Sequence, residues 1–173
     1  MRDIGFMRRI FNILFCTALI CVSCIKEGQT GSNLAVGDHV PDFTVIMNDG
    51  TTVTGELLCK GVSCIMFFTT VCPDCRQALP HMQKIYEGYT SQGVSVALIS
   101  RQEGAESIAQ FWHEQNFTMP YSAQDDREIY ELFAMTRVPR IYICKDGIIR
   151  SIFTDSPVPA YEDIRYALEN ALN

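Results

Sequence analysis

Residues 62–75, VSCIMFFTTVCPDC, decide the fold that this sequence predicts. The stretch begins with a short, mostly apolar run, VSCIMFF, which is typical of a strand buried on both faces of a sheet. Cys72-Pro73-Asp74-Cys75 follows and opens a segment with helical spacing. Two cysteines three positions apart can reach disulfide geometry across the first turn of a helix. A buried strand, a Cys-x-x-Cys motif and a helix in this order predict a redox site.

The position of each cysteine predicts its role. Cys72 stands at the expected helix start, where free backbone N–H groups and the helix dipole favour a thiolate and hence a nucleophile. Cys75 lies one turn further in and is the expected resolving thiol. Pro73 suits the first helical turn, because its missing N–H would be unpaired there. Two alternatives stay open, a structural disulfide and half of a zinc site; no second close ligand pair completes the latter, so we expect no metal.

Outward from this motif, strands and helices alternate. Apolar residues recur with helical spacing from Cys75 to Tyr89, and Pro80 should kink that helix. Asp-Gly turns predict β-hairpins over 42–54 and 140–153. The other predicted elements are a strand at 94–99 and helices at 105–115, 126–134 and 161–172. This order predicts an α/β fold, with an N-terminal β-hairpin and a central mixed sheet that has helices on both faces.

The first 23 residues differ from the rest of the chain. Three arginines precede an almost wholly apolar run at 10–22. That run is shorter than the ~20 residues of a spanning helix but is typical of the apolar centre of a signal peptide. Ser23-Cys24 at its end resembles a bacterial lipobox, although Cys21 occupies the usual leucine position. We expect lipidation at Cys24, with ordinary signal-peptide cleavage as the alternative.

This interpretation divides the chain into three parts. Residues 1–23 are a predicted lipoprotein signal peptide, 24–33 a polar, flexible tether and 34–173 one folded domain. The formal charge of the chain is −6, and loss of three Arg and one Asp with residues 1–23 makes it −8. An acidic body argues against a nucleic-acid partner and would not itself bind anionic lipid. We therefore expect a cell-envelope protein, facing the periplasm or the cell surface, held to the membrane by its lipid.

Several short motifs together resemble a known family. They are Val36-Gly37-Asp38, Pro41-Asp42-Phe43, Asn48-Asp49-Gly50, Phe67 to Cys72, Pro80, Val138-Pro139 and Lys145-Asp146-Gly147. Residues 34–172 thereby resemble the TlpA/ResA-type thioredoxin-like thiol-disulfide oxidoreductases of the AhpC/TSA-like thioredoxin-fold superfamily. The resemblance implies a thioredoxin-like fold, a Cys72–Cys75 redox pair and no cofactor. It also implies a protein thiol or disulfide as substrate and a membrane-embedded thiol reductase as electron donor.

The same resemblance gives Arg137-Val138-Pro139 a role. A proline at the start of a strand is allowed in general. A cis Val138–Pro139 bond packed against the sulfurs is the more specific hypothesis, although only ~5% of X-Pro bonds are cis. Val138 would then offer its backbone to an extended substrate segment. We take Arg137, Val138 and Pro139 as candidate substrate-binding residues.

The sequence departs from the family pattern around the motif. Val71 stands where Trp is usual, and Met66 and Ala78 stand where related proteins carry a carboxylate. Asp74 is then the nearest carboxylate, and its charge should oppose thiolate formation at Cys72. We therefore expect Pro73 and Asp74 to tune the sulfurs, and Asp74 to favour a reducing rather than an oxidising protein.

Three functions compete. The first is reduction of protein disulfides by Cys72 and Cys75. The second is a peroxiredoxin-like thiol peroxidase with antioxidant activity, whose P-x-x-x-T-x-x-C pattern is met at Thr69 but not at Ile65. The third is a non-enzymatic binding lipoprotein with a structural disulfide.

The remaining cysteines of the domain have no evident catalytic place. Cys64 and Cys144 fall in predicted strands and are expected to be inert core thiols. Cys59 lies in a loop, five residues before Cys64. A Cys59–Cys64 disulfide is an alternative in an oxidising compartment.

Overall fold

The computed structural model describes residues 32–173. The predicted signal peptide, Cys24 and nearly all of the tether lie outside these residues. Within 32–173, no helix is both long enough and apolar enough to cross a membrane. The described chain starts against the turn that follows α4 (Glu128–Glu131). There, the Leu34 N–H donates to the Phe133 carbonyl at 2.9 Å, and the Met135 N–H donates to Oδ1 of Asn33 at 2.9 Å.

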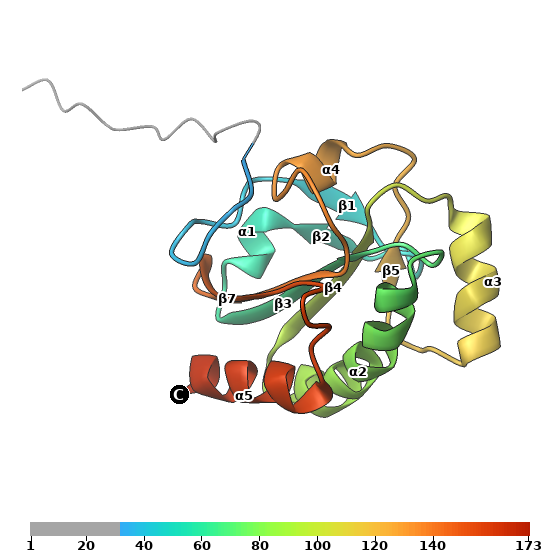
Figure 1. Ribbon diagram of the computed structural model, residues 1–173. Helices are drawn as coiled ribbons and strands as arrows, with labels where there is room; N and C mark the ends of the chain where they lie inside the picture. The colour runs from blue at the N-terminus through green and yellow to red at the C-terminus, as the bar shows by residue number, and fades with distance from the viewer. Residues whose placement is uncertain (1–31) are drawn as a thin grey trace, which may run out of the picture.

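A five-stranded mixed sheet forms the centre of the domain (Figure 1). Its strands are β3 (Val62–Phe68), β4 (Ser95–Ser100), β5 (Tyr121–Ser122), β6 (Arg140–Lys145) and β7 (Ile148–Phe153), in the order β5-β4-β3-β6-β7. Strand β3 pairs parallel with β4 and antiparallel with β6. Every residue of β3 is buried, which explains its unbroken apolar run. The mixed sheet predicted from the sequence is confirmed.

Helices cover both faces of this sheet (Figure 1). One face carries α2 (Pro73–Tyr89), α3 (Ala105–Gln115) and α5 (Tyr161–Leu172); the other carries α1 (Gly55–Leu58), α4 and the hairpin of β1 (Thr44–Ile46) and β2 (Thr52–Thr54). A short 3-10 helix, Thr90–Gln92, follows α2. The predicted N-terminal β-hairpin is confirmed as an antiparallel pair.

The structure differs from the predicted elements in three places. The helix expected at 126–134 is only α4, after which the N–H groups of Phe133 and Ala134 both donate to the Tyr130 carbonyl and turn the chain inward. The sequence does not predict α1 and β5, because they have four and two residues and are too short for a periodic signal. Pro80 lies inside α2, and the helix continues through it.

Phe67 centres an aromatic cluster between the sheet and α4. Its ring centroid lies 5.3 Å from that of Tyr130, 4.8 Å from that of Phe133 and 6.4 Å from that of Tyr142. All four side chains are fully buried. The cluster therefore attaches α4, and the loop that follows it, to the central strands.

Candidate active site

Cys72 lies at the junction between β3 and α2. It is the N-cap of α2, with an extended backbone, and Pro73 occupies the first helical position. The Arg76 N–H donates to the Cys72 carbonyl at 3.0 Å, which closes the first turn. The Cys72 side chain is half-buried, so its sulfur combines exposure with the positive end of a helix.

Cys75 faces inward from the same turn and is fully buried. Burial raises the pKa of its thiol well above the ordinary range, and the charges of Cys72 and Asp74 raise it further. A hydrogen bond with the Thr69 backbone acts in the opposite direction but does not offset burial. The two sulfurs therefore differ: the Cys72 sulfur is accessible, whereas the Cys75 sulfur is buried and stays protonated.

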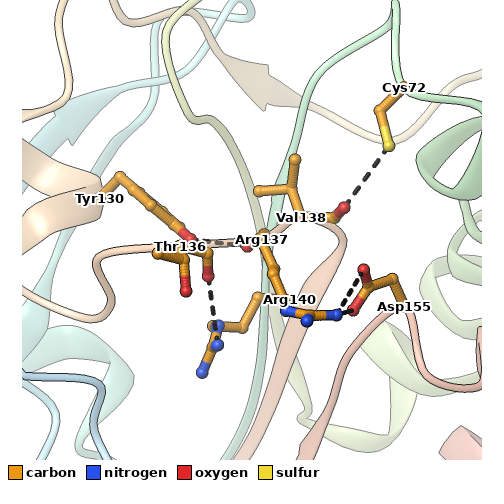
Figure 2. Close-up of polar contacts among 7 residues, drawn as sticks. All are labelled: Cys72, Tyr130, Thr136, Arg137, Val138, Arg140 and Asp155. Carbon is orange, nitrogen blue, oxygen red and sulfur yellow. Dashed lines mark hydrogen bonds and ion pairs between the residues drawn. The ribbon is translucent and has the colours of Figure 1, made fainter.

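The Val138–Pro139 peptide bond is cis and lies beside Cys72. The Cys72 thiol donates a hydrogen bond to the Val138 carbonyl at 3.4 Å (Figure 2). Val138 and Pro139 are both buried. The structure thus brings the two motifs together across 66 residues of sequence.

Hydrogen bonds to three consecutive backbone carbonyls, of residues 135–137, fix the loop that leads to Pro139. The Met135 carbonyl accepts from a terminal nitrogen of Arg127 at 2.8 Å, and the Thr136 carbonyl accepts from one of Arg140 at 3.3 Å. The next carbonyl, of Arg137, accepts from the Tyr130 hydroxyl at 2.6 Å (Figure 2). We call Arg127, Tyr130 and Arg140 the loop clamp. The sequence does not reveal this clamp, because no motif marks its three donors and only the fold brings them to this loop.

The side chain of Arg137 is held by an ion pair with the loop after β7. Its backbone is left-handed, with φ of 72°, which is uncommon for a residue other than glycine. Its guanidinium forms an ion pair with Asp155 at 3.2 Å, in the loop after β7 (Figure 2). Arg137 is therefore placed beside the Val138–Pro139 bond, with its charge already paired.

Thr70, two residues before Cys72, is fixed on both sides. Its N–H donates to Oε2 of Glu103 at 2.6 Å, and its hydroxyl donates to the other oxygen of that carboxylate. Its carbonyl accepts from Nε of Arg76 at 2.5 Å, and the Arg76 guanidinium lies 5.0 Å from the centre of the Phe111 ring. Glu103 is the half-buried carboxylate near the motif that the sequence did not reveal, because it follows β4 rather than β3.

The other polar candidates lie apart from the sulfurs. His81 contacts the Pro159 carbonyl through Nδ1 at 3.1 Å, which gives it a structural partner. Across the described residues, 32–173, no group of three or more His, Cys, Asp or Glu side chains could hold a metal ion. The five cysteines in this part of the chain are all free thiols.

Comparison with known proteins agrees with this geometry. A model of the AhpC/TSA family matches residues 36–153. Thiol-disulfide oxidoreductase ResA of Oceanobacillus iheyensis is 29% identical over 155 residues, covering 85% of this chain and 80% of the relative. ResA of Geobacillus thermodenitrificans is 26% identical over 170 residues, covering 95% and 94%.

Solved structures show the same fold. A putative protein disulfide isomerase from Bacteroides thetaiotaomicron has a TM-score of 0.70 at 22% identity, covering 79% of this chain and 87% of that one. A putative thiol:disulfide interchange protein DsbE from Chlorobium tepidum also has a TM-score of 0.70, at 19% identity, covering 82% and 100%. The fold is thioredoxin-like, as the sequence motifs implied. By its family match, the chain belongs to the AhpC/TSA family, and it stands there among thiol-disulfide oxidoreductases.

Proposed function

We propose that this protein reduces disulfides of other proteins in the cell envelope. The Cys72 thiolate attacks one sulfur of the substrate disulfide and displaces the other as a thiolate, which takes up a proton. Cys75 then attacks the Cys72 sulfur of the mixed disulfide. The substrate leaves as a dithiol, and Cys72–Cys75 becomes a disulfide. Two electrons and two protons pass from the pair to the substrate.

One observation carries this proposal, the unequal exposure of the two sulfurs beside the Val138 carbonyl. A substrate sulfur can reach half-buried Cys72, while buried Cys75 meets only the intermediate that Cys72 has formed. An extended substrate segment bound along the Val138 backbone would present its disulfide at the Cys72 sulfur. Val71, next to Cys72, is 78% exposed and adds an apolar contact for the substrate.

The other two hypotheses have less support. For a peroxidase, Ile65 is a buried residue in the middle of β3, and in the described part of the chain no arginine hydrogen-bonds the Cys72 sulfur. A purely structural disulfide would not require an accessible sulfur, whereas Cys72 is only half-buried. The family match and the oxidoreductase relatives also favour an enzyme.

Anchoring and electron supply belong to the proposal. A lipid on Cys24 would keep the domain at the membrane. A reductant outside the cytosol must be reduced again after each turnover, and a membrane-embedded thiol reductase is the donor that we propose.

The direct test is reduction of insulin disulfides by the pre-reduced protein. We expect insulin to precipitate with the wild-type protein and not with Cys72→Ser, and we expect hydrogen peroxide to be consumed no faster than by Cys72→Ser. Peroxide consumption that depends on Cys72, without insulin reduction, would instead support the peroxidase.

Replacing Asp74 by Asn should make the Cys72–Cys75 disulfide more oxidising. A carboxylate in the motif opposes negative charge on the sulfurs, so its removal stabilises the reduced, thiolate-bearing form. Two unit charges ~6 Å apart repel by at most ~3 kcal/mol at an effective dielectric of ~20. Asp74 is partly exposed, so about half of this, roughly 30 mV, is the expected rise in reduction potential.

Asp125→Asn, on the surface outside the motif, removes the same charge and should leave the potential unchanged. An unchanged potential in Asp74→Asn would remove the physical basis for a reducing role.

Replacing Tyr130 by Phe should weaken substrate binding without changing the redox potential. The substitution removes one donor of the loop clamp and leaves the aromatic packing in place. We expect KM for a protein substrate to rise several-fold, with a stability loss of about 1 kcal/mol. Tyr89→Phe is the matched control, because its hydroxyl donates to Oε1 of Glu169 at 3.0 Å, between α2 and α5 and away from the loop clamp. Equal effects of the two variants on KM would show that the clamp does not position the substrate.

A further inference from the structure

A second group of thiols lies at the other end of β3. Cys144, on β6, pairs in the antiparallel register with Ser63, the second residue of β3, and both are fully buried. Cys72 follows the opposite end of β3, about 20 Å away at ~3.3 Å per residue. These thiols therefore have no part in the exchange at Cys72 and Cys75.

Ser63 connects Cys144 to Cys59. Its hydroxyl donates to the Leu58 carbonyl at 3.0 Å, and its side chain lies close enough to the Cys144 thiol to lower the pKa of that thiol. Leu58 directly precedes Cys59, which ends α1 as its C-cap. One serine side chain thus touches Cys144 and the residue next to Cys59, and the two cysteines share one face of the sheet.

The turn after Cys144 brings the Cys59 sulfur closer. A Cβ placed on Gly147 would lie only 2.6 Å from the Cys59 sulfur, so Cys59 packs directly on the β6–β7 turn. Asp146 and Gly61 bind each other twice, through the Asp146 N–H to the Gly61 carbonyl at 2.8 Å and the Gly61 N–H to the Asp146 carboxylate at 3.2 Å. The loop that carries Cys59 is therefore fixed over the end of β6.

Cys64 is excluded from this arrangement although it is nearer to Cys59 in sequence. Side chains alternate along a strand, so Cys64 faces away from Ser63, toward the α2 and α5 face. Burial raises the pKa of Cys144 to about 12, and the charge of Cys59 on the same face raises that pKa further. The Cys59–Cys64 disulfide considered from the sequence gives way to a different pair.

We propose that Cys59 and Cys144 are a second dithiol, which low-molecular-weight disulfides oxidise to a Cys59–Cys144 disulfide. Cys59 is half-buried and makes the first attack, on the small disulfide, whereas Cys144 is closed to solvent. The Cys59 thiolate displaces one thiol from the small disulfide and forms a mixed disulfide. Cys144 then attacks the Cys59 sulfur and displaces the second thiol. Two protein thiols lose two electrons and two protons, and one small disulfide becomes two thiols.

Such a disulfide would fasten the connection between α1 and β3 to the β6–β7 hairpin. A crosslink between residues so distant in sequence restricts the unfolded chain, so the oxidised form should be the more stable. In an oxidising compartment this disulfide would stabilise the folded protein, independently of the catalytic pair.

The test uses the full chain with Cys72 and Cys75 replaced by Ser, incubated with oxidised glutathione. Peptide mapping should show Cys59 linked to Cys144 and Cys64 still alkylatable. The oxidised protein should unfold at a higher temperature than the same protein after reduction. Glutathione remaining on Cys59, a Cys59–Cys64 link or no oxidation at all would each overturn the proposal.

Two further variants of that protein are matched controls. With Cys144→Ser added, Cys59 should stop at the glutathione adduct and the rise in unfolding temperature should disappear. With Cys64→Ser added, the Cys59–Cys144 link should form as before. Loss of the link in Cys64→Ser, in a protein with an unchanged circular dichroism spectrum, would contradict the assignment. Because Cys72 and Cys75 are absent throughout, the outcome does not depend on the proposed catalytic function.

Discussion

A Cys75→Ser variant will accumulate as a mixed disulfide between Cys72 and its protein substrate. Cys75 lies directly behind the attacking sulfur, and within residues 32–173 no other thiol is placed to resolve the intermediate, because Cys59, Cys64 and Cys144 lie toward the opposite end of β3. Turnover should fall to the background rate, while the first attack proceeds. Non-reducing electrophoresis and mass spectrometry of the trapped complex would identify the substrate.

Two controls make this trapping experiment decisive. Adding Cys72→Ser to Cys75→Ser should abolish the complex, and Cys64→Ser should turn over like the wild type. A complex linked through any cysteine other than Cys72 would reverse the assignment of the attacking thiol.

Replacing Phe67 by Ala will cost about 3–5 kcal/mol of the free energy of unfolding. The ring is fully buried and contacts Tyr130, Phe133 and Tyr142, so its removal leaves a cavity that rigid strands and rings cannot close. Urea denaturation followed by circular dichroism would measure the loss. Tyr166→Ala is the control, since that side chain is 66% exposed and its removal should change stability by less than about 0.5 kcal/mol. A loss below 1 kcal/mol in Phe67→Ala would mean that the aromatic cluster does not hold α4 to the sheet.

Local patterns predicted the parts of this protein that depend on neighbours in sequence. The buried run of β3, the helix after the motif and the Asp-Gly hairpins all have periodic or turn signals. The cis Val138–Pro139 bond was expected from a family resemblance rather than from spacing, and the structure contains it. A second cis bond, Ser156–Pro157, was not expected.

Partnerships between distant residues could not be predicted in this way. Glu103 reaches Thr70 across 33 residues, because parallel strands β3 and β4 end at the same edge of the sheet. The loop clamp depends on α4 ending early and turning inward, a consequence of aromatic packing that no local propensity describes. The proposal that Cys59 pairs with Cys144 rather than Cys64 rests on strand register, which only the assembled sheet defines.

The position of Asn33 and Leu34 in the fold limits how far the domain can lie from the membrane. Asn33 and Leu34 bind the turn at Phe133 and Met135, immediately before the loop that carries Val138. With the proposed lipid on Cys24, the nine residue steps from Cys24 to Asn33 extend at most about 32 Å, at ~3.3–3.6 Å per step. The tether would then enter the domain beside the turn that precedes the Val138 loop and keep this part of the domain within that distance of the bilayer. A donor embedded in the membrane would be within reach of the domain, whereas substrates would be confined to proteins that come to the membrane surface.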